Sequence, residues 1–133
     1  MHTHLAQVKH NEEFLSVIEG HCPEDYFDWK IIVVFYAGLH YLRALEKLNN
    51  VEIGGTHGDL FYHINPYKTG RLMPIDVDIY NAYSALYNLS TSSRYDGIDD
   101  KEQHKRAQQY CLVLAKDYYY IVKGYCMDQG VTV

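Results

Sequence analysis

The fold is decided by residues 25–49, DYFDWKIIVVFYAGLHYLRALEKLN. At 100° per residue, this stretch places one broad apolar face along a helix: Ile31, Val34, Phe35, Gly38, Leu42 and Leu45. The opposite stripe is aromatic and basic: Trp29, Val33, Tyr36, His40, Arg43 and Lys47. With Pro23 at a permitted first-turn position, we predict a helix over 23–49, roughly 40 Å long. We expect this aromatic and basic stripe to be covered in part by another helix, a second subunit or a ligand.

Four other segments show helical signals, and no strand-like alternation interrupts them. We predict helices over 3–19, 56–65, 76–93 and from 99 to about 125. Gly20 is expected to stop the first of these helices, and Thr56 with Asp59 is expected to cap the third. Pro66 ends the third helix near Asn65, and Asp76 begins the fourth. The pattern predicts an all-α protein, with residues 1–133 forming a single domain.

The last predicted helix carries a long stripe at helical spacing: Tyr110, Cys111, Leu114, Tyr118, Ile121 and Tyr125. We expect the second and fifth helices to be the longest and to pack nearly antiparallel through their apolar stripes. Leu42 and Leu114 are then predicted to be deeply buried. A second stripe on the fourth helix consists of Tyr80, Tyr83, Tyr87 and Arg94.

Composition narrows the class of protein. The chain has 133 residues, of which 47% are hydrophobic and 22% charged, which is typical of one globular domain. Its 12 basic and 17 acidic residues give a net charge of −5, so any contact with RNA must come from a local patch. The longest apolar run, 31–38, is too short to span a bilayer. Three cysteines in no paired pattern favour reduced thiols in a cytoplasm.

Three segments resemble the HEPN family of helical proteins. Residues 35–45, FYAGLHYLRAL, resemble the long second helix of that family, and 55–60, GTHGDL, resemble the start of the helix that follows. Residues 87–90, YNLS, followed by 94–97, RYDG, look like the end of its fourth helix. Together the matches cover about residues 25–125 in the family's order.

The resemblance implies an antiparallel, up-down bundle of four to five helices, often a dimer. It also implies association with RNA cleavage, toxin–antitoxin pairs and defence systems. HEPN ribonucleases typically carry an Arg followed by a His after four to six residues, the Arg for phosphate and the His for acid–base chemistry. Here 13 residues separate Arg43 from His57 and nine separate Arg94 from His104, so the signature is absent.

Candidate site residues follow from the resemblance and the stripes. His57 and Arg94 are the candidate catalytic pair, if the fold brings them together. Residues expected to contact RNA or a nucleotide are Tyr36, His40, Arg43, Tyr83, Tyr87 and Arg94. The structural alternatives are a hydrogen-bonded buried His40, an Arg43 reaching out from the helix edge, a helix-capping role for His57 and an Asp96–Arg94 pair.

No metal site and no cofactor are predicted, because His57 and His63 lack the spacing that brings two ligands together on a helix. His2, His4 and His10 lie in a terminal segment that we expect to fray, and they are given no role.

Two functions therefore stay open. The first is a HEPN-type module acting on or with RNA or a nucleotide, as a degenerate or accessory member of a toxin–antitoxin or defence system. Its partner would be a nucleotidyltransferase-type protein. The second is a non-catalytic interaction module, in which the tyrosine-rich stripe is a dimer interface or a face for docking a partner protein. In a homodimer, we expect Trp29 and Tyr36 to be buried in the interface.

Overall fold

The computed structural model describes residues 2–92 and 101–132, without the side chains of His2 and Lys101. Over these residues the chain forms five helices: α1 (His2–His21), α2 (Phe27–Leu48), α3 (His57–Ile64), α4 (Val77–Ser92) and α5 (Lys101–Asp128). No strand occurs in the described ranges, and the all-α prediction is confirmed. The boundaries predicted at Ser93–Gly97 and at Asp99–Asp100 lie outside them. None of the described helices is long and apolar enough to cross a membrane.

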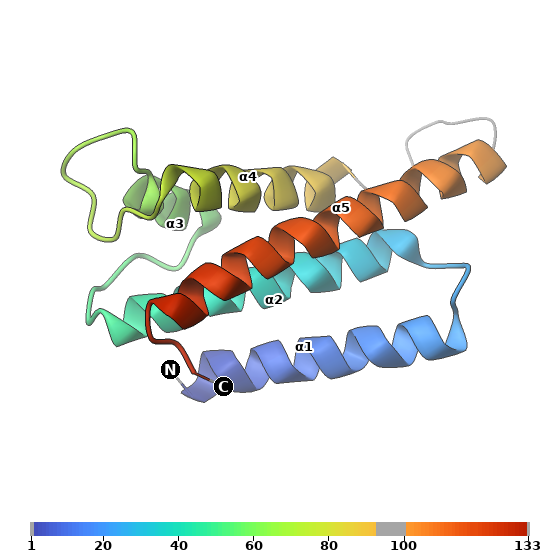
Figure 1. Cartoon of the computed structure of the whole chain (residues 1–133), viewed down its shortest axis with the longest axis horizontal. Helices are drawn as coiled ribbons and strands as arrows, with labels where there is room; N and C mark the ends of the chain where they lie inside the picture. The colour runs from blue at the N-terminus through green and yellow to red at the C-terminus, as the bar shows by residue number, and fades with distance from the viewer. Residues whose placement is uncertain (1, 93–100, 133) are drawn as a thin grey trace.

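Helix α2 occupies the centre of the bundle, between α1 on one side and α4 and α5 on the other (Figure 1). The four long helices α1, α2, α4 and α5 alternate in direction along the chain, with short α3 set beside the start of α4. Helices α5 and α2 are the longest, at 28 and 22 residues, as predicted.

These two helices are parallel, however, and the prediction that they would be antiparallel was wrong. Lys105, near the start of α5, pairs with Asp25 just before α2, and Tyr119, further along α5, packs on Tyr41 of α2. The reason is topological: α4 lies between them in chain order, and two reversals restore the direction of α2.

The core consists largely of the α2 face that the sequence indicated. All six of the predicted residues on that face are buried, and Leu42 is fully inaccessible. Gly38 allows α4 to approach closely, because a Cβ at this position would lie 3.1 Å from a methyl carbon of Leu86. This is tighter than ordinary van der Waals contact, so an alanine here would require the Leu86 side chain to shift by a few tenths of an ångström.

The buried stripe of α5 lies one residue beyond the predicted one. It consists of Leu112, Ala115, Tyr119, Val122 and Cys126. The predicted members Tyr110 and Ile121 are 65% and 44% exposed, and Leu114 is only half-buried, so the burial predicted for it was wrong. The cause is an ambiguous pattern: α5 carries large apolar side chains around most of its circumference, and a shift of one residue still satisfies the helical period.

The turn between α1 and α2 also differs from the prediction. Helix α1 continues through Gly20 to His21, and α2 begins at Phe27 rather than at Pro23. Tyr26 has a left-handed backbone, with φ of 61°, and this conformation makes the reversal. The buried Lys30 of α2 then donates from Nζ to the carbonyl oxygen of Cys22, 2.6 Å away, at the negative end of α1.

Two caps fix the loop that joins α2 to α3. Asn49 donates from its side chain to the carbonyl of Leu45, and Asn50 takes a left-handed conformation with φ of 53°. At the far end, Thr56 Oγ1 accepts from the N–H of Asp59, whose carboxylate accepts from the N–H of Thr56. This reciprocal capping box confirms the predicted start of α3 and sets His57 at the first position of the helix.

Candidate functional site

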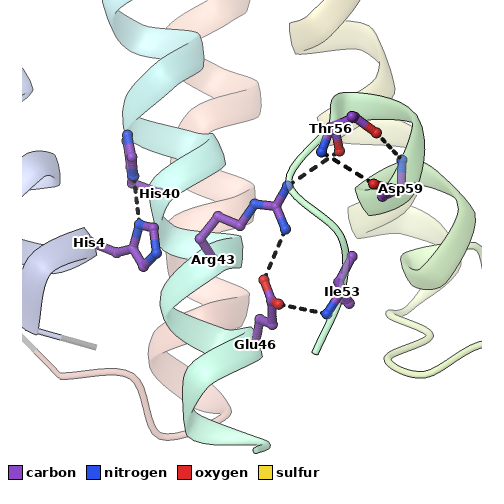
Figure 2. Close-up of polar contacts among 7 residues, drawn as sticks. All are labelled: His4, His40, Arg43, Glu46, Ile53, Thr56 and Asp59. Atoms are coloured by element: carbon purple, nitrogen blue, oxygen red, sulfur yellow. Dashed lines mark hydrogen bonds and ion pairs between the residues drawn. The ribbon is translucent and has the colours of Figure 1, made fainter. Parts of the chain in front are cut away.

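The α2–α3 loop is held to α2 by a buried ion pair (Figure 2). Arg43 donates to a carboxylate oxygen of Glu46 at 3.0 Å and to the carbonyl oxygen of Thr56 at 3.3 Å. The other oxygen of Glu46 accepts from the N–H of Ile53 at 2.7 Å. The side chain of Arg43 is 11% exposed and that of Glu46 is 6% exposed. Arg43, expected to contact phosphate, therefore has a structural role that already occupies a hydrogen-bond donor on each of its two terminal nitrogens.

Two imidazoles meet beside this ion pair. The Nδ1 atom of His4, from α1, lies 2.9 Å from the Nδ1 atom of His40, from α2 (Figure 2). Burial is the main cause that lowers the pKa of both rings, and nearby Arg43 lowers both further. His4 thus belongs to helix α1 and contacts a predicted site residue, although the sequence analysis gave it no role.

A pocket of about 350 Å³ opens against these groups. Its lining residues come from α1, α2, the α2–α3 loop and the start of α3: His4, Leu39, His40, Arg43, Glu46, Lys47, Ile53, Gly55 and His57. Arg43 and Glu46 balance each other, and both His4 and His40 have lowered pKa values. Lys47, which is exposed, has no ion-pair partner in the described part of the chain, so the pocket keeps one net positive charge. We call it the polar pocket.

A second pocket, of about 360 Å³, lies between α2, α3 and α4. Its walls are aromatic and hydroxyl-bearing: Ile32, Phe35, Tyr36, His57, Tyr87, Ser90 and Thr91. The ring centroid of His57 lies 5.7 Å from those of Phe35 and Tyr87 and 6.4 Å from that of Tyr36. We call this the aromatic pocket, and His57 lines both it and the polar pocket.

The predicted tyrosines divide into accessible and buried ones. Tyr36 is 41% exposed and Tyr87 is half-buried at the aromatic pocket. Tyr83 is fully buried among Phe35 and Phe61, so it offers no face to a ligand, contrary to the prediction. Burial also raises the pKa of its hydroxyl, which has no hydrogen-bond partner within the described ranges.

The structure describes only one member of the predicted catalytic pair, His57. His57 makes ring contacts, but no hydrogen bond or ion pair joins it to a group that the structure describes. Arg94 lies outside the described residues. Among those residues, no three His, Cys, Asp or Glu side chains come close enough to hold a metal ion.

Sequence reasoning missed two residues of the site. Glu46 had a local signal, since it follows Arg43 by three positions on the same helix and can pair with it. His4 had no such signal, because its contact with His40 depends on how α1 packs against α2.

No protein-family model, no curated protein and no solved structure matches this chain. The HEPN resemblance therefore rests on the sequence segments themselves.

Proposed function

We propose that this chain is a HEPN-type helical module that binds a nucleotide, free or as a unit of single-stranded RNA, and cleaves RNA weakly or not at all. The observation that carries the proposal is the shared wall at His57. His57 lines both the aromatic pocket and the polar pocket, which keeps a net positive charge.

The two pockets suit the two chemical halves of a nucleotide. A base can stack on an exposed aromatic ring, which is worth about 1–3 kcal/mol per base, and Tyr36 and Tyr87 supply such rings. A phosphate would sit in the polar pocket, where Lys47 supplies the unpaired charge. Each pocket is near the lower end of the ligand-site range of roughly 300–1,000 Å³, as expected if each holds half of a small ligand.

The surroundings of His57 argue for binding rather than efficient catalysis. A general base needs a partner that orients it, and the described contacts of His57 are aromatic. Arg43, which lines the polar pocket together with His57 and could stabilise a phosphorane-like charge, is paired with Glu46. With the usual Arg-to-His spacing also absent, we propose a degenerate family member.

The test is a binding titration with adenosine monophosphate and with a short fluorescein-labelled single-stranded RNA. We expect Tyr36→Ala and His57→Ala each to weaken binding about five- to hundredfold, the range of one lost stacking contact. Tyr110→Ala is the matched control, because Tyr110 is 65% exposed on α5 and lines neither pocket. Equal binding by all three variants would refute the proposal. Robust RNA cleavage that His57→Ala abolishes would refute its non-catalytic part.

A second candidate function is favoured by a separate apolar surface. Helix α1 and the start of α2 expose Phe14, Val17, Tyr26 and Trp29, at 49%, 55%, 57% and 58%. Together with Ile18, His21 and Cys22 they line an apolar groove of about 330 Å³. Such a patch is typical of protein-interaction sites, and we propose a second copy of this chain as its occupant.

Trp29 is the single tryptophan of the chain and reports directly on that surface. On dimerisation its fluorescence should shift to shorter wavelength as protein concentration rises, and Trp29→Ser should leave a monomer by sedimentation. A wild-type monomer over the same range, with unshifted fluorescence, would exclude the dimer. Tyr36, predicted to share the interface, is 41% exposed and lies further along α2.

The remaining proposals rest on the family resemblance. We propose an accessory role in a toxin–antitoxin or defence system, with a nucleotidyltransferase-type protein as partner. A cytoplasmic location is supported by Cys22, Cys111 and Cys126, which are all unpaired.

A further inference from the structure

We infer that the His4–His40 pair is a proton-linked anion receptor: it takes up one proton when the phosphate group of a ligand enters the polar pocket. This inference deepens the proposed function and rests on it for the identity of the natural ligand. The starting observation is the contact between the two Nδ1 atoms, 2.9 Å apart, on the wall of that pocket.

The distance limits where protons can be. Only one hydrogen fits between two nitrogens at this separation, so one Nδ1 donates and the other accepts. In the neutral pair, the donor ring has a free lone pair on Nε2, and the acceptor ring carries its proton there. A proton from solvent can therefore add to Nε2 of the donor ring without disturbing the contact. The product is an imidazolium that donates to a neutral imidazole, a charge-assisted hydrogen bond.

A second proton is a different matter. It would place N–H groups on both Nδ1 atoms and turn the contact into a repulsion between two cations. The pair therefore has room for one added proton, and its two steps belong to the pair rather than to either ring.

The charges around the pair favour the neutral state until an anion arrives. The titratable and charged groups of the polar pocket are Arg43, Glu46 and Lys47 of α2 and His57 of α3. Arg43 is balanced by Glu46, which leaves Lys47 as the net charge. Burial lowers the pKa of both His4 and His40 in the free protein. The charge of the amino terminus, Arg43 and Lys47 lower the pKa of His4 further, and His4 and Arg43 lower that of His40. A dianion in the pocket would reverse the electrostatic part of that shift, because an opposite charge nearby favours the protonated form.

The consequence is a defined pH dependence. At a pH between the pKa of the pair in the free protein and the higher value in the complex, binding takes up close to one proton. Affinity then rises as pH falls, by at most about tenfold per pH unit. Sulfate is the best probe, because it remains a dianion across this range, whereas a phosphate monoester with a pKa near 6 would add its own titration.

The experiment is isothermal titration calorimetry of metal-free protein with sodium sulfate, from about pH 8 to pH 6, in two buffers of different ionisation enthalpy. Wild type should bind more tightly at the lower pH, with an uptake approaching one proton. His4→Gln/His40→Gln should lose this uptake and the pH dependence. His10→Gln, an exposed histidine on the same helix, is the matched control and should behave as wild type.

A second measurement locates the proton. The ring ¹³Cε1–¹H signals of His4 and His40 should report a higher pKa with sulfate than without it. The signal of His10, which does not line the polar pocket, serves as the control and should be unaffected by sulfate. Uptake that persists in the double variant, or pKa values unmoved by sulfate, would overturn the inference.

The outcome separates this inference from the proposed function. Nucleotide binding that depends on Tyr36 but takes up no proton would refute the receptor and leave the nucleotide site. Sulfate binding with proton uptake, but no nucleotide binding, would refute the nucleotide site alone. No sulfate binding to wild type at either pH would show that the polar pocket is not an anion site.

Discussion

Replacing Glu46 with alanine tests how the α2–α3 loop, and with it His57, is held. The substitution removes the acceptor for the guanidinium of Arg43, 3.0 Å away, and for the N–H of Ile53, 2.7 Å away. Breaking a buried ion pair from one side costs about 3–5 kcal/mol, and an unsatisfied buried N–H about 1–3 kcal/mol. The Arg43 side chain retains 11% exposure and some hydration, so the lower part of the range applies. We expect a loss of about 3–4 kcal/mol in the free energy of unfolding.

The free energy of unfolding is measured by urea denaturation, and its dependence on urea concentration should be the same for the variant and the wild type. Glu46→Gln keeps one acceptor oxygen, which can still accept from the N–H of Ile53, but its NH2 group cannot accept from Arg43. We therefore expect it to cost about half as much as the alanine variant. Glu52→Ala is the control in the same loop, because Glu52 is exposed and should change stability by no more than about 0.5 kcal/mol. A loss below about 1 kcal/mol for Glu46→Ala, or equal losses for the alanine and glutamine variants, would refute the reasoning.

Three other changes test packing and charge. Leu42→Ala should lower the free energy of unfolding by about 3–5 kcal/mol, because Leu42 is fully buried. Leu114→Ala should lower it clearly less, because Leu114 is only half-buried. Equal losses for the two variants would contradict the assignment of the α5 stripe. Tyr119→Phe should cost about 1–2 kcal/mol in urea, since it removes a 2.5 Å hydrogen bond to a carboxylate of α1, and a neutral result would show that this bond adds nothing. Because the folded-state pKa values of His4 and His40 lie below 6.5, the unfolded chain binds protons first, and stability present above pH 6.5 is lost as pH falls below it. The wild type should therefore lose more stability than His4→Gln/His40→Gln between about pH 7.5 and 5.5, and parallel curves would contradict this.

The parts of the fold predicted correctly are those with one dominant local signal. Helix α2 has a single apolar face, so its period identified the core, and Thr56 with Asp59 defined the start of α3 through a cap that depends on four consecutive residues. The stripe of α5 was misassigned because Tyr118, Tyr125 and their neighbours are large and apolar on more than one side. Packing against α2 and α4 decides which of them turns inward.

The sequence predicted most of the residues that line the candidate site, but not how they are arranged. His40, His57, Tyr36 and Tyr87 do line the two pockets. The contact of His40 with α1, however, comes from a pair 36 positions apart in sequence, and no local pattern indicates such a contact. The buried position of Tyr83 has the same explanation, because tyrosines at helical spacing look alike until the neighbouring helices are placed.

The central claim is that one small ligand occupies both pockets across His57. The most direct measurement is a ¹⁵N-resolved NMR titration with adenosine monophosphate, which maps the bound ligand on the whole described chain. We predict that the shifted amides cluster at residue 4 and at residues 32–47, 53–57 and 87–91, the segments that line the polar and aromatic pockets. Shifts confined to residues 14–29, the exposed apolar groove, or no shifts at millimolar ligand, would contradict the claim.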